Sequence, residues 1–160
     1  MGWKEFCKYY KDENLIKKKC KENNHSLKGV SNKKYLILDG DKISEKLFPD
    51  KKSADCILVS KEPVKSNKHD VILCELGEQK RYTDVQNKLT NSGNYICKKL
   101  KDNQLDVKNI YAVFVGTYSL PHQEKRTRKP FTICKFYNSI QIHYAPRFFD
   151  IKDLQLKRTK

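Results

Sequence analysis

The sequence lacks segments that would place the chain in or on a membrane. No apolar segment opens it, and no apolar run approaches the ~20 residues of a membrane-spanning helix. Phe6 stands where an N-myristoylation motif requires serine or threonine. We therefore expect a cytoplasmic protein with no membrane partner.

The sequence also lacks several motifs of catalytic or metal chemistry. It contains no G-x-S-x-G, no phosphate-binding glycine loop and no C-x-x-C, and the nearest approach to half a zinc site is Cys20 with His25. The six cysteines show no paired spacing, and most of them fall in apolar patterns. Free cysteine in such a setting packs as a small hydrophobe, which favours a reducing compartment.

What the chain has in excess is positive charge. Its 34 Lys and Arg residues against 19 Asp and Glu give a formal net charge of +15. Such an excess attracts polyanions, of which nucleic acid is the commonest, although a generally lysine-rich composition would give the same number. With 160 residues, 38% of them hydrophobic, the chain fits a single folded domain over residues 1–160.

Hydrophobic periodicity predicts an α/β fold, with a central mixed β-sheet flanked by helices. The predicted helices cover residues 3–23 and 83–101, with one or two helical turns over 41–48, and the predicted strands cover 35–38, 54–60, 71–76 and 110–115. The loop over 61–68 suits an antiparallel hairpin, whereas the strand, helix and strand from 71 to 115 suit a parallel crossover. A C-terminal hairpin is expected from strands 131–137 and 140–144, followed by a loosely held tail from about residue 151.

Two acidic residues lie at the ends of predicted buried strands. Asp55 precedes the apolar run that begins at Cys56, and Glu75 follows the apolar run of the next strand. A buried carboxylate is costly unless it is paired or holds a cation. Two carboxylates from neighbouring strands suit a hard cation such as Mg²⁺, so we expect Asp55 and Glu75 to share a metal.

Two further residues are candidates for the same site. Glu13 is the charged member of an otherwise apolar helical stripe, so it either adds a metal ligand or pairs with Lys17 one turn away. Gln86 lies early in the helix after Glu75, where it either supports a ligand or water or forms a capping box with Thr83.

The order of these features resembles the PD-(D/E)XK (restriction-endonuclease-like) nuclease family. The matching pieces are Asp39-Gly40, Asp55-Cys56, Glu75-Leu76-Gly77 and Gln86, over roughly residues 35–116. The resemblance implies a nuclease fold in which the two acids bind Mg²⁺ or Mn²⁺. It also implies a lysine two residues after the second acid, which orients or activates the attacking water.

In this chain Gly77 replaces that lysine. Residues 75 and 77 share one face of a strand, so the expected ammonium group is missing there. Lys80 is the nearest lysine able to reach back across the glycine, and Glu78 is a candidate additional metal ligand. The third possibility is an inactive site.

These features predict a metal-dependent phosphodiesterase that hydrolyses DNA or RNA, with Asp55, Glu75 and Lys80 as catalytic residues. Phosphate contacts are expected from Lys88 and from a basic loop that contains Lys125, Arg126, Arg128 and Lys129. The alternative is an inactive protein of the same fold that binds nucleic acid, a protein partner or a second copy of itself.

Overall fold

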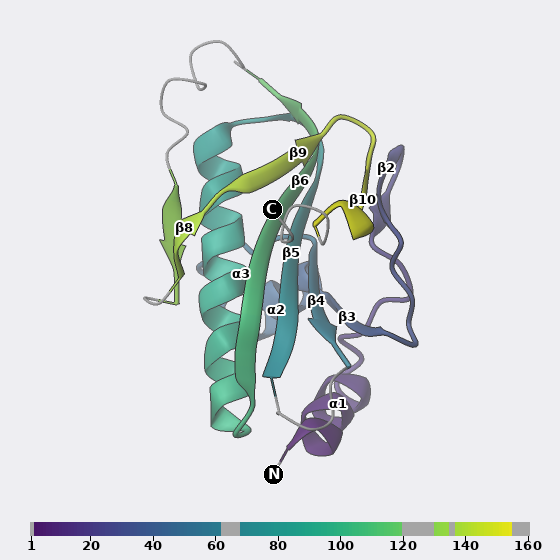
Figure 1. The fold of residues 1–160 in the computed structure, drawn as a ribbon, viewed down its shortest axis with the longest axis vertical. Helices are drawn as coiled ribbons and strands as arrows, with labels where there is room; N and C mark the ends of the chain where they lie inside the picture. Colours follow the sequence, from purple (N-terminus) through teal and green to yellow (C-terminus); the bar gives the residue numbers. More distant parts are fainter. Residues whose placement is uncertain (1, 62–67, 120–129, 135–136, 155–160) are drawn as a thin grey trace.

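A five-stranded mixed sheet forms the centre of the molecule in the computed structural model, which describes residues 2–61, 68–119, 130–134 and 137–154 (Figure 1). The strand order is β3-β4-β5-β6-β9. The strands span Tyr35–Asp39 (β3), Cys56–Ser60 (β4), Lys68–Lys80 (β5), Asp106–Tyr118 (β6) and Ile142–Ala145 (β9). β3, β4 and β5 form an antiparallel meander, whereas β6 runs parallel to both β5 and β9. The predicted α/β class with a mixed central sheet is confirmed.

Helices and a small sheet cover the two faces of this central sheet. The helices are α1 (Trp3–Asp12), α2 (Gly40–Leu47) and α3 (Tyr82–Asp102), and α3 connects β5 to β6 alongside them (Figure 1). Val85, Leu89 and Ile96 of α3 are buried in one core with the odd-numbered residues Val71 and Leu73 of β5.

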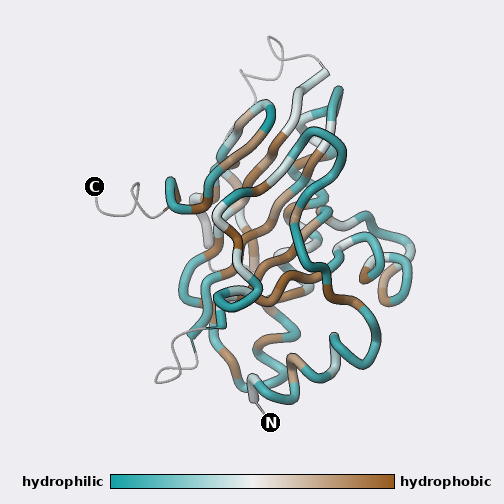
Figure 2. The backbone as a smooth tube through the Cα atoms, turned by 90° about the vertical axis from the view of Figure 1, so that its right-hand side faces the viewer, coloured by the Kyte–Doolittle hydropathy of each residue, from teal (hydrophilic) through white to brown (hydrophobic). Residues whose placement is uncertain are grey.

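The opposite face carries the even-numbered residues Ile72, Cys74 and Leu76, which form a second core with Leu27 and Phe149. These two covering residues come from β2 (His25–Lys28) and β10 (Phe148–Asp150), which form a three-stranded sheet with β1 (Lys21–Glu22). Figure 2 shows the hydrophobic segments concentrated in the interior strands, with hydrophilic segments in the surrounding loops. Glu75 therefore lies on the face that α3 covers.

The first helix is shorter than the periodicity predicts. It ends at Asp12, because Asn14 adopts a left-handed conformation (φ 57°) that a continuing helix does not allow. The backbone N–H of Lys17 then donates to the carbonyl of Ile37, and Ile16 bridges to Leu38. The apolar stripe after Asp12 thus comes from an extended segment that packs against β3.

The predicted C-terminal hairpin forms with different bounds. β7 (Phe131–Ile133) pairs with β8 (Tyr137–Ile140), and the second predicted strand instead joins the central sheet as β9. Residues 138–139, predicted as a turn, lie within β8. Ile151 and Leu154 are buried, so the chain is held against the second core as far as residue 154.

Two disulfides contradict the expectation that the cysteines pack as free thiols. Cys20 is bonded to Cys56, and Cys97 is bonded to Cys134. Cys7 and Cys74 are free. The partners lie 36 and 37 residues apart in the sequence, so spacing gave no sign of either bond.

None of the helices in the described ranges is long and apolar enough to cross a membrane.

Candidate functional site

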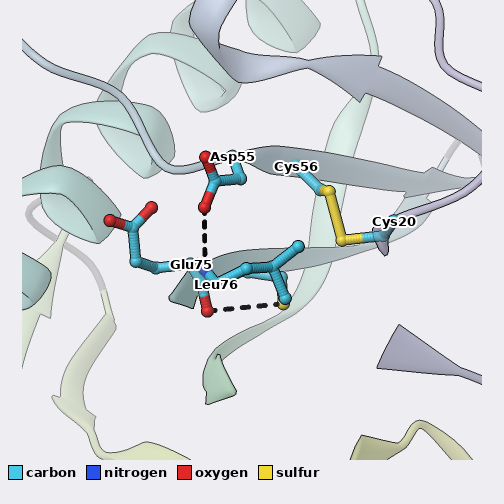
Figure 3. The surroundings of a disulfide bond; sticks show 6 residues. Cys20, Asp55, Cys56, Glu75 and Leu76 are labelled. Atoms are coloured by element: carbon cyan, nitrogen blue, oxygen red, sulfur yellow. Dashed lines mark hydrogen bonds between the residues drawn. A yellow bond between two sulfur atoms is a disulfide. The ribbon is translucent and has the colours of Figure 1, made fainter. Parts of the chain in front are cut away.

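Asp55 and Glu75 lie side by side on the face of the sheet that α3 covers. β4 and β5 pair with Cys56 opposite Cys74, which places Asp55 opposite Glu75 one step further along. Both residues are buried, with exposed fractions of 8% and 0%. Figure 3 shows the two carboxyl groups on the same side, with the Cys20–Cys56 disulfide directed away from them.

Hydrogen bonds from two helices hold the segment before β4, and this segment positions Asp55. The backbone N–H of Gly40, at the start of α2, donates to the carbonyl of Asp55 at 2.9 Å. A Cβ atom at Gly40 would lie 1.6 Å from the carbonyl oxygen of Ala54, so this approach requires glycine. The Ser92 hydroxyl accepts a hydrogen bond from the backbone N–H of Ala54 at 2.7 Å. The Ser53 and Ser92 hydroxyl groups are also hydrogen-bonded to each other, at 2.6 Å. Helices α2 and α3 therefore both hold the segment that delivers Asp55.

Asp55 is protonated more readily than an ordinary carboxyl group. Burial, the charge of Glu75 and a hydrogen bond with the Glu75 carboxyl group together raise its pKa to about 7. The N–H of Leu76, which donates to Asp55 Oδ2 at 2.7 Å, opposes this increase. Two carboxyl groups this close are stable together when they share a proton or a positive charge.

Lys88 supplies one such positive charge. Its Nζ donates to Glu75 Oε2 at 2.7 Å from the first turns of α3. Burial alone would lower the pKa of Lys88, but the hydrogen bond and charge of Glu75, with the charges of Asp55 and Asp41, give a raised pKa. The sequence pattern assigns Lys88 to phosphate contacts at the surface, whereas the structure directs it inward to Glu75.

The other carboxylate oxygen of Glu75 has no such partner. Glu75 Oε1 is buried and, apart from the neighbouring Asp55 carboxyl group, has no hydrogen-bond partner among the described residues. Buried polar atoms in native proteins are nearly always satisfied, and an unsatisfied charged one is especially costly. Glu75 Oε1 is therefore the atom of this site best placed to bind a cation together with Asp55.

Lys80 occupies the space over Gly77. A Cβ atom at Gly77 would lie 2.6 Å from Lys80 Cε and 3.3 Å from Lys80 Nζ. Gly77 has φ 133°, and β5 contains one extra residue between Gly77 and Lys80 relative to β6. This β-bulge pairs Lys80 with Tyr118, so Lys80 returns to the face of Glu75 despite its even number.

The remaining predicted site residues have different positions. Glu13 forms an ion pair with Lys46 of α2, instead of Lys17, and is not brought to Asp55 and Glu75. Helix α3 begins at Tyr82, one residue before Thr83, and its N-cap residue Arg81 makes no side-chain cap. The capping box with Gln86 is therefore wrong, and a supporting role for Gln86 remains a prediction.

Glu78 lies 3.7 Å from His25, and its side chain is 68% exposed. Lys125, Arg126, Arg128 and Lys129 lie outside the described residues.

One acidic residue near the site was not a candidate from the sequence. Burial of the Asp41 carboxyl group and the charges of Asp55 and Asp39 raise the pKa of Asp41 to about 6, although the residue as a whole is exposed. Asp39 caps α2 by accepting from the N–H of Lys42. The Asp39-Gly40-Asp41 sequence is typical of a turn, so the sequence did not predict that Asp41 lies near Asp55.

Across the described parts of the chain, no group of three or more His, Cys, Asp and Glu side chains has metal-binding geometry. A cation at this site would therefore take two protein carboxylates and complete its coordination with water, as Mg²⁺ commonly does.

Comparison of the chain with models of known families, with curated proteins and with solved structures found no match.

Proposed function

We propose that this protein is a metal-dependent nuclease that hydrolyses phosphodiester bonds of nucleic acid at the Asp55–Glu75 pair. The observation that carries the proposal is the pair of neighbouring buried carboxyl groups, Asp55 just before β4 and Glu75 on β5. Apart from Asp55, Oε1 of Glu75 has no hydrogen-bond partner among the described residues. A structural role alone does not account for two neighbouring buried acids, because apolar residues would fill the same place at lower cost.

Asp55 and Glu75 are the residues that would hold Mg²⁺ or Mn²⁺. The all-oxygen, negatively charged pair suits a hard cation, and the raised pKa of Asp55 means that cation binding displaces a proton near neutral pH. When bound, such a metal lowers the pKa of water and stabilises the leaving oxyanion.

Two lysines would replace the family's motif lysine. Lys88 holds the orientation of Glu75 through its 2.7 Å hydrogen bond and places a positive charge beside the pair. Lys80 lies over Gly77 on the same face, where it can contact a non-bridging phosphate oxygen. Positive charges fixed in a site of low polarity stabilise the charge that develops on the phosphate.

The element order adds support to this proposal. The β3-β4-β5 meander, α3 and the parallel strand β6 follow one another in the order that the resemblance implies, with Asp55 immediately before β4 and Glu75 on β5.

A catalytically inactive nucleic-acid-binding protein is the second candidate. It is favoured by the ion pair between Lys88 and Glu75, which already neutralises one acid without a metal. In this case the net charge of +15 would supply the affinity for nucleic acid, and the two carboxylates would only stabilise the fold. A protein partner or a homodimer belongs to this alternative.

The cellular compartment of the protein depends on whether it needs its two disulfides to fold and function. A cytoplasmic location, as the sequence predicts, requires that the protein function with Cys20–Cys56 and Cys97–Cys134 reduced, because cytosolic thiols are kept reduced. Folding that depends on both bonds would instead favour an oxidising compartment.

Cleavage and metal binding together test the proposed function. Purified protein is incubated with labelled single-stranded and duplex DNA and RNA in Mg²⁺, Mn²⁺ or EDTA, and Mn²⁺ binding is measured by electron paramagnetic resonance. We expect cleavage and stoichiometric Mn²⁺ binding in the wild type, both lost in Asp55→Asn and Glu75→Gln but kept in the surface variant Asp12→Asn. Absence of Mn²⁺ binding by the folded wild type would refute the metal site, and binding of nucleic acid without cleavage would favour the second candidate.

A further inference from the structure

An exposed aromatic ring lies beside the proposed catalytic site. Tyr144 is on β9, an edge strand of the central sheet, and 41% of its surface is exposed. Its ring stacks on that of Tyr118, with centroids 5.2 Å apart and planes 17° from parallel. A tyrosine held flat in this way loses little conformational freedom when a second planar group stacks on it.

Other aromatic residues pack against the stacked pair on its core side. Tyr118 contacts Phe114 at a centroid distance of 4.6 Å and Tyr82, the first residue of α3, at 5.7 Å. Phe114 is fully buried, and Tyr82 is 4% exposed. The four rings therefore form a continuous cluster that begins in the core and ends at the exposed Tyr144.

The strand register places this cluster next to the acids. Glu75 pairs with Phe114 of β6, and Phe114 pairs with Tyr144 of β9, so the three side chains share one face in a row across the sheet. With adjacent strands 4.7–4.9 Å apart, Tyr144 lies about 10 Å from Glu75 across the sheet. Lys80, which pairs with Tyr118, lies on the same face.

We propose that Tyr144 is a stacking platform for an unpaired nucleobase next to the scissile phosphate, so that the preferred substrate is single-stranded. The inference rests on the proposed function and adds the substrate class to it. A base within a duplex is already stacked on both faces, whereas a single-stranded base is free to stack on an aromatic ring. The phosphate beside such a base would reach the lysines, and the net charge of +15 favours a polyanion over an apolar protein partner.

Tyr144→Leu and Tyr144→Trp test this role while keeping the packing against Tyr118. Dissociation constants for a labelled 12-nucleotide single strand, in DNA and RNA forms, and for the matched duplex are measured by fluorescence anisotropy in EDTA. The control is Phe148→Leu, because Phe148 is 54% exposed but belongs to the small sheet on the other face. Thermal unfolding confirms that each variant is folded.

We expect Tyr144→Leu to weaken single-strand binding about tenfold and duplex binding much less, because base–aromatic stacking contributes about 1–3 kcal/mol per base. Tyr144→Trp should retain or strengthen binding, and Phe148→Leu should have no effect. A series of oligonucleotides carries one abasic site at successive positions. For the wild type, the abasic site should weaken binding most at one position, whereas for Tyr144→Leu no position should stand out.

The outcomes separate this inference from the proposed function. Equal losses for single strand and duplex, or no loss in Tyr144→Leu, would overturn the stacking role while wild-type cleavage leaves the nuclease proposal standing. A wild type that binds no form of nucleic acid would overturn both.

Discussion

At the scale of single residues, the site depends on where protons and positive charges lie between Asp55 and Glu75. The two acids compete for stabilisation, and the structure provides the N–H of Leu76 for one and the ammonium group of Lys88 for the other. The cation, when present, would add to this balance and not create it. Removing Asp55 and removing Lys88 should therefore change stability in opposite directions, although both should lower activity.

Asp55→Asn should make the metal-free protein more stable at neutral pH. The pKa of Asp55 is about 7 in the folded protein and 3.8 in an ordinary setting, so the folded state binds more protons between these values. Wild-type stability should thus fall as pH rises from about 4 to about 7, whereas Asp55→Asn should lack this loss. Thermal unfolding in EDTA from pH 4 to pH 8 measures the difference, with Asp12→Asn as the control. A wild type that gains stability across this window would contradict the raised pKa.

Lys88→Met should lower the rate of cleavage by at least about 100-fold, the effect of removing one preorganised charge from a transition state. It should also destabilise the fold by about 1–3 kcal/mol, because the buried Glu75 then loses the ammonium donor to its Oε2. Lys98→Met, on an exposed turn of the same helix, is the matched control. Unchanged kcat in Lys88→Met would assign the family lysine's role to Lys80 alone.

At the scale of secondary-structure elements, the sequence predicted the strands better than the contacts between elements. The placement of Asp55 and Glu75 on one face could be derived, because alternation along β4 and β5 fixes it. The inward position of Lys88 could not, since it depends on how Val85 and Leu89 rotate α3 against the sheet.

Some residues that weaken a helix locally make contacts with residues distant in the sequence. The Asn91-Ser92-Gly93 triplet reads as a weak point in α3, yet Ser92 binds the segment before Asp55. A Cβ atom at Gly93 would lie 2.4 Å from Ile133 Cγ2. Polar and small residues inside a helix are thus explained by a neighbour that is distant in sequence.

Gly77→Lys, which places a lysine two residues after Glu75 as in the nuclease motif that the sequence resembles, should not increase activity in this chain. The φ of 133° is unfavourable for any side chain, and Lys80 already fills the space. We expect a loss of about 1–3 kcal/mol in the free energy of unfolding, measured by urea denaturation, and no gain in cleavage rate. Faster cleavage than the wild type in a stable Gly77→Lys variant would show that the bulge rearranges.

At the scale of the whole molecule, charge and covalent links act over longer distances than the site does. The excess of positive charge is a property of composition, and the sequence alone predicts its consequence. The disulfides join segments that pattern analysis treats separately.

Binding to nucleic acid should weaken steeply with salt. Replacing Lys125, Arg126, Arg128 and Lys129 together by Ala should reduce the slope of log K against log salt by about 3, if each contacts one phosphate of a single strand. Anisotropy titrations from 50 to 300 mM KCl with two unrelated oligonucleotides measure the slope. A slope equal to that of the wild type would place the phosphate-binding surface elsewhere.

Reduction of the disulfides should lower thermal stability substantially. Each bond closes a loop of about 36 residues, for which loss of unfolded-chain entropy corresponds to about 4 kcal/mol. Differential scanning calorimetry with and without a reductant measures the shift, and the Cys20→Ser and Cys97→Ser variants assign it to each bond. Equal unfolding temperatures in both conditions would fit a protein that functions reduced.

The bulge after Gly77 has a consequence for recognising distant relatives by pattern. The bulge returns Lys80 to the face of the acid although this lysine lies five residues after Glu75, instead of the two residues of Glu-x-Lys. A search string with fixed Glu-x-Lys spacing rejects such a chain although its lysine lies on the face of the acid. A pattern for such sites should therefore also accept a glycine two residues after the acid followed by a lysine three residues later.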